Sequence, residues 1–158
     1  MKFLRIAALA LVTAAVGFGF AQEEEAPLDG ENLYLQSCAS CHLPEGTGQE
    51  ERFPALAGHI PHLANADGGR EYLMNVVMWG LSGEITVLGE TFDRSMPARF
   101  TLANDELAAI LNYITTAWGN DALLADDFAA FEADELNEVR RSSRDWALQF
   151  RPDIDPEL

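Results

Sequence analysis

Five consecutive residues, Cys38-Ala-Ser-Cys41-His42, are the strongest guide to the structure of this chain. The pattern Cys-x-x-Cys-His is the attachment site of a c-type haem. Two thiols three positions apart lie on one side of a helical turn, where both can add to vinyl groups along one porphyrin edge. The histidine that follows can then ligate the iron from the proximal side. The chain has 2 cysteines, so a haem bound here would use both of them.

Three other interpretations of the cysteine pair remain open. A thioredoxin-like dithiol also uses Cys-x-x-Cys, but in a βαβ context that this sequence does not show. A disulfide between the two thiols would close a very small loop and contribute little stability. A zinc site is a third possibility, although His-x-x-His is shorter than the usual histidine spacing. Its four ligands would be Cys38, Cys41, His59 and His62.

The charge balance narrows the choice of partners. The chain has 158 residues, enough for one domain with a core, and 48% of them are hydrophobic. Lys and Arg number 10 against 26 Asp and Glu, which gives a net charge of −16. Such a charge argues against nucleic acid and anionic membrane surfaces as partners. A protein with a basic docking surface is the better expectation.

The N-terminal residues predict a secretory signal peptide over residues 1–21. Lys2 and Arg5 form a positive start, residues 6–20 are apolar, and cleavage is expected after Ala21. The apolar run is short for a membrane span and acidic residues follow it at once, so we expect no membrane anchor after cleavage. Loss of two basic and no acidic residues changes the net charge from −16 to −18. We therefore expect an exported protein, periplasmic in a bacterium, where c-type haem is attached.

The apolar spacing predicts several further elements. Residues 22–28 form an acidic linker. Helical spacing then leads directly into Cys38, and a second helix is expected over residues 71–79. Residues 83–92 alternate around a glycine with β-branched side chains, which predicts a small β-hairpin.

An amphipathic helix is expected in the second half of the chain. Asn104 is a suitable N-cap for it, and Gly119-Asn120 should end it after Trp118. Its predicted apolar face consists of Leu107, Ile110, Leu111 and Ile114.

Beyond this helix the pattern is weaker. One or two short helices are expected, and residues 152–158 should be loosely held. The apolar positions that mark these helices are Phe128, Phe131, Leu136 and Val139.

Taken in order, four segments resemble those of a class I, monohaem cytochrome c. They are the Cys-x-x-Cys-His motif, the Phe-Pro-x-Leu-x-Gly run at residues 53–58, the Met96-Pro97 loop and the amphipathic helix. The resemblance covers residues 29–120, which would be the cytochrome domain. It implies an all-α fold in which a few helices wrap around one covalently bound haem c, with a small β-hairpin before the distal-ligand loop. Residues 121–158 would be a C-terminal helical extension and tail.

The resemblance also implies a role for each site residue. Cys38 and Cys41 would be the thioether anchors, and His42 the proximal iron ligand. Met96 occupies the position of the distal iron ligand, whose soft sulfur favours ferrous iron and raises the reduction potential. Pro54 matches the proline whose carbonyl accepts a hydrogen bond from the proximal imidazole.

Four other candidate residues have more than one possible role at a haem site. His59 and His62 are best interpreted as surface side chains, with a distal-ligand or propionate role as the alternative. Arg70 or Arg99 could pair with a haem propionate, and the sequence does not choose between them.

The resemblance implies an electron carrier without substrate turnover, because both axial positions of the iron would be filled. It would pass single electrons between respiratory redox partners in the periplasm. One alternative is the electron-accepting cytochrome subunit of a periplasmic dehydrogenase or reductase complex. A less favoured alternative is a non-haem zinc or dithiol protein.

Overall fold

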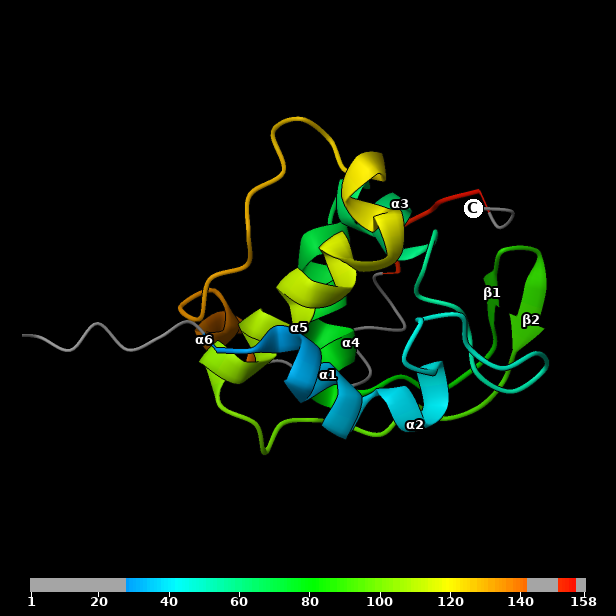
Figure 1. Ribbon diagram of the computed structural model, residues 1–158, viewed down its shortest axis with the longest axis horizontal. Helices are drawn as coiled ribbons and strands as arrows, with labels where there is room; N and C mark the ends of the chain where they lie inside the picture. Colours follow the sequence, from blue (N-terminus) through cyan, green and yellow to red (C-terminus); the bar gives the residue numbers. More distant parts are fainter. Residues whose placement is uncertain (1–27, 142–150, 156–158) are drawn as a thin grey trace, which may run out of the picture.

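The computed structural model describes residues 28–141 and 151–155 (Figure 1). The predicted signal peptide and residues 22–27 of the predicted linker lie outside the described residues. The chain is mostly helical with one small sheet, as predicted. Its elements are α1 (Gly30–Ser37), α2 (Ala39–His42), α3 (Ile60–Asn65), α4 (Gly69–Trp79), β1 (Ile85–Val87), β2 (Glu90–Phe92), α5 (Asn104–Thr116), the 3₁₀ helix η1 (Ala117–Leu123) and α6 (Leu136–Val139).

Helix α1 packs against α5, and the two backbones approach closely at Gly30 (Figure 1). A Cβ atom at Gly30 would lie 2.3 Å from the carbonyl oxygen of Ala109, so only glycine fits at this crossing. Beside it, the Tyr34 ring packs on the rings of Tyr113 and Trp118 at centroid distances of 5.3 and 5.1 Å. This crossing fixes where α1 ends and therefore where the cysteine motif begins.

Helix α4 runs through the core against α5. The prediction of a helix over residues 71–79 is confirmed, and the helix begins two residues earlier, at Gly69. Tyr72, Leu73 and Met78 are buried, and α5 buries the apolar face that the sequence predicted.

The boundaries of α5 differ from the prediction at both ends. Ala103, not Asn104, holds the N-cap position, and the Glu106 carboxylate accepts a hydrogen bond from the Ala103 N–H at 2.8 Å. The Asn104 side chain instead contacts residues of the C-terminal extension. The helix ends at Thr116 because Trp118 and the next residue have left-handed backbone angles, with φ of 58° and 85°. That turn places the Trp118 ring over Gly46, where a Cβ would collide with it.

The predicted hairpin is confirmed. Strands β1 and β2 pair antiparallel, with Ile85 opposite Phe92 and Val87 opposite Glu90. The two turn residues, Leu88 and Gly89, have φ of 52° and 77°, as in the hairpin turns whose twist matches that of the strands.

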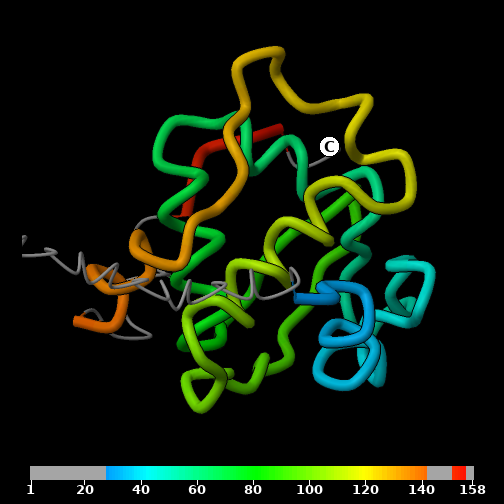
Figure 2. Tube along the Cα trace, turned by 60° about the vertical axis from the view of Figure 1, so that its left-hand side comes forward, coloured from blue at the N-terminus to red at the C-terminus, as the bar shows by residue number. Residues whose placement is uncertain are grey.

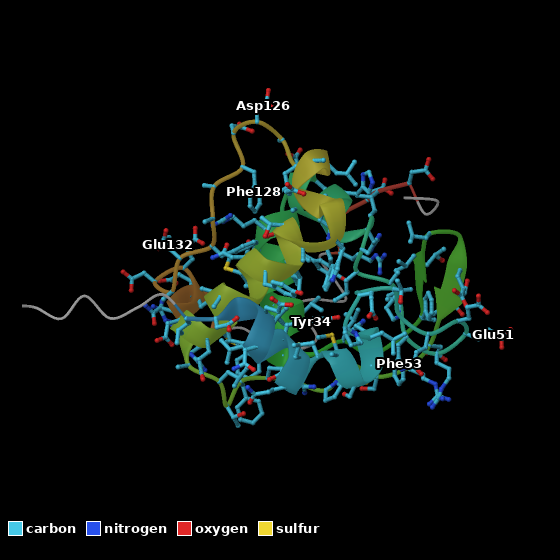
Figure 3. All side chains as sticks on the ribbon, viewed as in Figure 1. Tyr34, Glu51, Phe53, Asp126, Phe128 and Glu132 are labelled. Carbon is cyan, nitrogen blue, oxygen red and sulfur yellow. The ribbon has the colours of Figure 1, made fainter. Side chains whose placement is uncertain are left out.

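In the C-terminal extension, α6 packs against α4 and α5. Of the helices predicted there, α6 is present, whereas Phe128 and Phe131 lie in irregular backbone. Phe131 is nevertheless 2% exposed, and Arg70 donates hydrogen bonds to the carbonyls of residues 129 and 130 and to Glu135. Figure 2 shows this segment arching from η1 to α6, and in Figure 3 Phe128 points inward while Asp126 and Glu132 point outward.

The expectation that residues 152–158 are loosely held is wrong for 152–155. Pro152 is buried, and Ile154 packs against the hydrophobic core. Residues 156–158 lie outside the described part of the chain. Within the described ranges, no helix combines the length and apolarity needed to cross a membrane.

Candidate functional site

A cavity of about 530 Å³ opens between α2, α4, α5 and the hairpin. This volume is within the range of ligand and cofactor sites. Its walls are largely apolar, with side chains such as Leu73 and Val77 from α4 and Ile110 and Ile114 from α5. The cavity can therefore take one large, mainly apolar group.

Both cysteines line this cavity. The Cys38 N–H bonds to the Tyr34 carbonyl at 2.8 Å, and the Cys41 N–H to the Cys38 carbonyl at 3.1 Å, so the two thiols share one turn. Burial raises the pKa of Cys38 to about 11, although the nearby Arg99 partly opposes the effect. A thiol with a raised pKa is not the reactive thiolate of a dithiol oxidoreductase. This observation argues against the thioredoxin-like alternative.

His42 follows at the end of α2, 8% exposed and facing the cavity. Burial lowers its pKa below the usual range, and the hydrogen bond to Pro54 opposes this only in part, so the imidazole is neutral near pH 7. Its Nδ1 atom lies 2.9 Å from the Pro54 carbonyl oxygen. A neutral ring that donates from Nδ1 keeps the Nε2 lone pair for a metal.

Hydrogen bonds fix both ends of the loop that contains Pro54. The Gly48 N–H bonds to the His42 carbonyl at 3.0 Å, and a Cβ at Gly48 would lie 2.4 Å from the Phe53 carbonyl oxygen. At the other end, the buried Asn120 accepts from the Gly58 N–H at 2.7 Å. These contacts of the loop backbone, rather than any contact of the Pro54 side chain, therefore hold the Pro54 carbonyl in position.

Met96 reaches the same cavity from the loop after the hairpin. Its N–H and carbonyl pair with those of Leu81 at 2.7 and 3.2 Å. Gly80 permits this contact, because a Cβ there would lie 2.2 Å from the Met96 carbonyl oxygen. Met74 and Met78, by contrast, are buried in the core and do not line the cavity.

The two histidines after the motif lie in different environments. His59 is 3% exposed and lines the cavity, so its interpretation as a surface residue is wrong. His62 does not line it. In residues 28–141 and 151–155, no three His, Cys, Asp or Glu side chains converge as a metal site, so the structure gives the zinc alternative no support.

The two candidate propionate-binding arginines lie in different places. Arg70 lies outside the cavity and pairs with Glu135 at 2.7 Å. Arg99 lines the cavity next to Cys38 and donates to the Ser37 carbonyl at 2.6 and 3.1 Å. The lining also includes Tyr72 and Arg151. Sequence reasoning missed Arg151 as a site residue because no motif or spacing marks it.

The donor set in this cavity fits a haem: two thiols on one turn, a neutral imidazole, a thioether and apolar walls. A cytochrome c family model matches residues 28–118, more than half of the chain. The chain belongs to the cytochrome c family.

Among its relatives, the cytochrome is 39% identical over 140 residues to a cytochrome c-552 of Thermus thermophilus. That match covers 89% of this chain and 84% of the relative. A second Thermus thermophilus cytochrome c-552 is 43% identical over 112 residues, covering 71% and 84% of the two chains. The cytochrome is therefore an electron carrier with covalently bound haem c, rather than an enzyme.

Cytochrome subunits of larger enzymes are also similar to parts of this cytochrome. The cytochrome c subunit of the quinone alcohol dehydrogenase of Gluconobacter oxydans is 35% identical over 98 residues. The match covers 59% of this chain but 19% of that subunit.

Proposed function

We propose that this cytochrome carries single electrons between respiratory redox partners in the periplasm. Cys38 and Cys41 would hold the haem through thioether bonds, and His42 and Met96 would supply the nitrogen and sulfur donors to its iron. The observation that supports this most is that these four side chains, from two separate segments, line one cavity.

Each residue has a physical task at this site. The haem supplies a one-electron couple. The Pro54 carbonyl accepts the Nδ1 proton of His42, which orients the ring and makes it a stronger donor. The Met96 sulfur is a soft donor that favours ferrous iron, and the apolar walls exclude water.

The proposal includes export and domain organisation. The signal peptide would be residues 1–21, followed by the linker 22–28, the cytochrome domain 29–120 and the extension 121–158. A family match over residues 28–118 supports these domain limits. The positive, then apolar, then small-residue pattern of the N-terminus supports export.

We expect the redox partner to present a basic docking surface. Exposed carboxylates gather on the loop after α2 and on the hairpin, both of which border the haem cavity. Figure 3 shows Glu51 at this outer edge, beside Phe53. Opposite charges would guide brief encounters at the exposed haem edge. The carboxylates are those of Glu45, Glu50, Glu51, Glu84 and Asp93.

The alternative is a role as the cytochrome subunit of a dehydrogenase complex. The match to the Gluconobacter oxydans subunit supports it, but that match spans 19% of the subunit against 84% of a cytochrome c-552. A free carrier is therefore favoured. Recovery of the cytochrome in a stable complex with a catalytic dehydrogenase subunit would support the alternative instead.

Two measurements on the purified mature protein test the proposal. After acid-acetone extraction, the haem should stay with the protein and give the pyridine haemochrome of a two-thioether haem. Membranes of the source organism should then oxidise the reduced cytochrome catalytically. Extraction of the haem, or reduced protein that the membranes leave unoxidised, would contradict the proposal.

A further inference from the structure

The described C-terminal segment, residues 151–155, forms part of the cavity wall. Arg151 lines the cavity and donates a hydrogen bond from Nη2 to the Thr86 carbonyl in β1 at 2.8 Å. It also hydrogen-bonds to the side chain of Tyr72, which is 2% exposed in α4. Pro152 is buried and Ile154 packs against the core, so this segment is anchored beside the cavity.

This segment and the cysteine motif border different ends of the cavity. In Figure 1, α2 lies at the lower end of the region between α5 and the hairpin, and the red segment 151–155 lies at its upper end near α3. Figure 2 shows the same separation from another direction. His59, the residue before α3, also lines the cavity.

The structure of the porphyrin ring predicts which end of the cavity the haem propionates would occupy. The vinyl groups that form thioethers and the two propionates lie on opposite edges of the ring. If Cys38 and Cys41 hold the vinyl edge, the propionates face the end of the cavity where Arg151 and Tyr72 lie. A carboxylate there loses water and needs a donor, and an arginine guanidinium is well suited to bind it.

The other arginines of the cavity are placed less well for this task. Arg99 lies beside Cys38, at the thioether edge, and its donors are directed at backbone carbonyls. Arg52 and Arg94 are exposed and stand over the Phe53 ring, 5.6 and 5.9 Å from its centroid. Arg151 is half-buried and adjoins a buried tyrosine hydroxyl.

We propose that Arg151 and the Tyr72 hydroxyl bind a haem propionate, so that the C-terminal segment closes the propionate edge of the haem. The inference rests on the proposed attachment at Cys38 and Cys41. The positive charge of Arg151 near the haem favours the ferrous state, because ferrous haem carries one positive charge fewer than ferric haem. A propionate left without Arg151 would favour the ferric state.

Four variants of the mature holoprotein test this proposal. Arg151→Gln removes the charge, Arg151→Lys keeps it, and Tyr72→Phe removes only the hydroxyl. Arg141→Gln is the matched control, because it removes an exposed positive charge that does not line the cavity. The readouts are the reduction potential and the propionate bending mode in the resonance Raman spectrum. The pyridine haemochrome of each variant reports whether attachment is intact.

Arg151→Gln should lower the potential and shift the propionate mode, Arg151→Lys should restore most of the potential, and Tyr72→Phe should give a smaller change in the same direction. Arg141→Gln should leave both the potential and the propionate mode nearly unchanged. An unchanged mode and potential in Arg151→Gln, with haem attached, would overturn the proposal but not the proposed function. Equal shifts in Arg141→Gln and Arg151→Gln would also overturn it, since they would reflect the loss of any positive charge rather than of a propionate contact. Loss of covalent haem from the wild-type protein would instead refute the proposed function.

Discussion

The Nδ1 atom of His42 and the carbonyl oxygen of Pro54 lie 2.9 Å apart, although 12 positions separate them in the chain. The contact selects the tautomer in which Nδ1 carries the proton and the Nε2 lone pair is free to bind a metal. It forms because the intervening loop folds back through Gly46 and Gly48, both with left-handed backbone angles. The geometry of the proximal side is therefore built into the protein by this loop.

Loss of both thioethers should disrupt the fold. The cavity lies between the helices and the hairpin of a small domain, and without haem its apolar walls would be left without a partner. The double variant Cys38→Ala, Cys41→Ala should therefore lack covalent haem and be largely disordered by circular dichroism and limited proteolysis. Ser40→Ala, on the same turn, should keep the haem. A protease-resistant, haem-free double variant would show that this expectation is wrong.

The Arg70–Glu135 ion pair should stabilise the protein at neutral pH and lose its effect in acid. Burial alone would raise the pKa of Glu135, but the hydrogen bonds from Arg70 and the Glu132 N–H, together with the charge of Arg70, outweigh it, and the net pKa lies below its usual range. A carboxyl of this kind contributes stability above its unfolded pKa, about 4.3, and loses it as pH falls through the folded value. Since the Glu135 side chain is 37% exposed, the contribution should be at most about 1 kcal/mol.

The measurement is the free energy of unfolding of wild type and Glu135→Gln at pH 7 and pH 3. The variant should be less stable at pH 7, and the difference should shrink at pH 3. Glu138→Gln is the matched control, because the Glu138–Arg141 pair is 75% and 70% exposed and should contribute little. A difference for Glu135→Gln that is the same at both pH values would contradict the expected linkage.

Electron exchange with the partner should depend on salt. The mature chain is expected to carry a net charge near −18, since the signal peptide removes two basic residues from a total of −16. Attraction to a basic partner should fade as the Debye length falls from about 30 Å at 0.01 M to about 10 Å at 0.1 M salt. The second-order rate with the physiological partner should therefore fall across this range. A flat rate would favour apolar contact at the haem edge and assign the acidic surface to solubility alone.

Local patterns predicted the parts of this molecule that local contacts determine. The cysteine motif lies on one turn, and alternation around Gly89 correctly predicted a hairpin. The amphipathic spacing located α5, whereas its N-cap was misplaced by one residue because Asn104 is bound by Asn137 and Arg140 instead.

The features that the sequence did not predict depend on contacts between residues far apart in the chain. Arg151 contacts Thr86 across 65 positions, and neither residue belongs to a recognisable motif. The irregular path of the extension depends on Arg70, which bonds to carbonyls about 60 positions away. Because such contacts depend on the assembled core, no periodicity in the sequence predicts them. Burial of His59 has the same origin, since the loop around it folds over the cavity.

The near-infrared spectrum of the ferric protein shows whether Met96 ligates the haem iron. A sulfur–iron bond gives a weak charge-transfer band there, and the soft donor raises the reduction potential. Met96→Ala should abolish the band and lower the potential, while Met74→Leu, in the core and away from the cavity, should keep both. An unchanged band and potential in Met96→Ala would show that another residue ligates the iron.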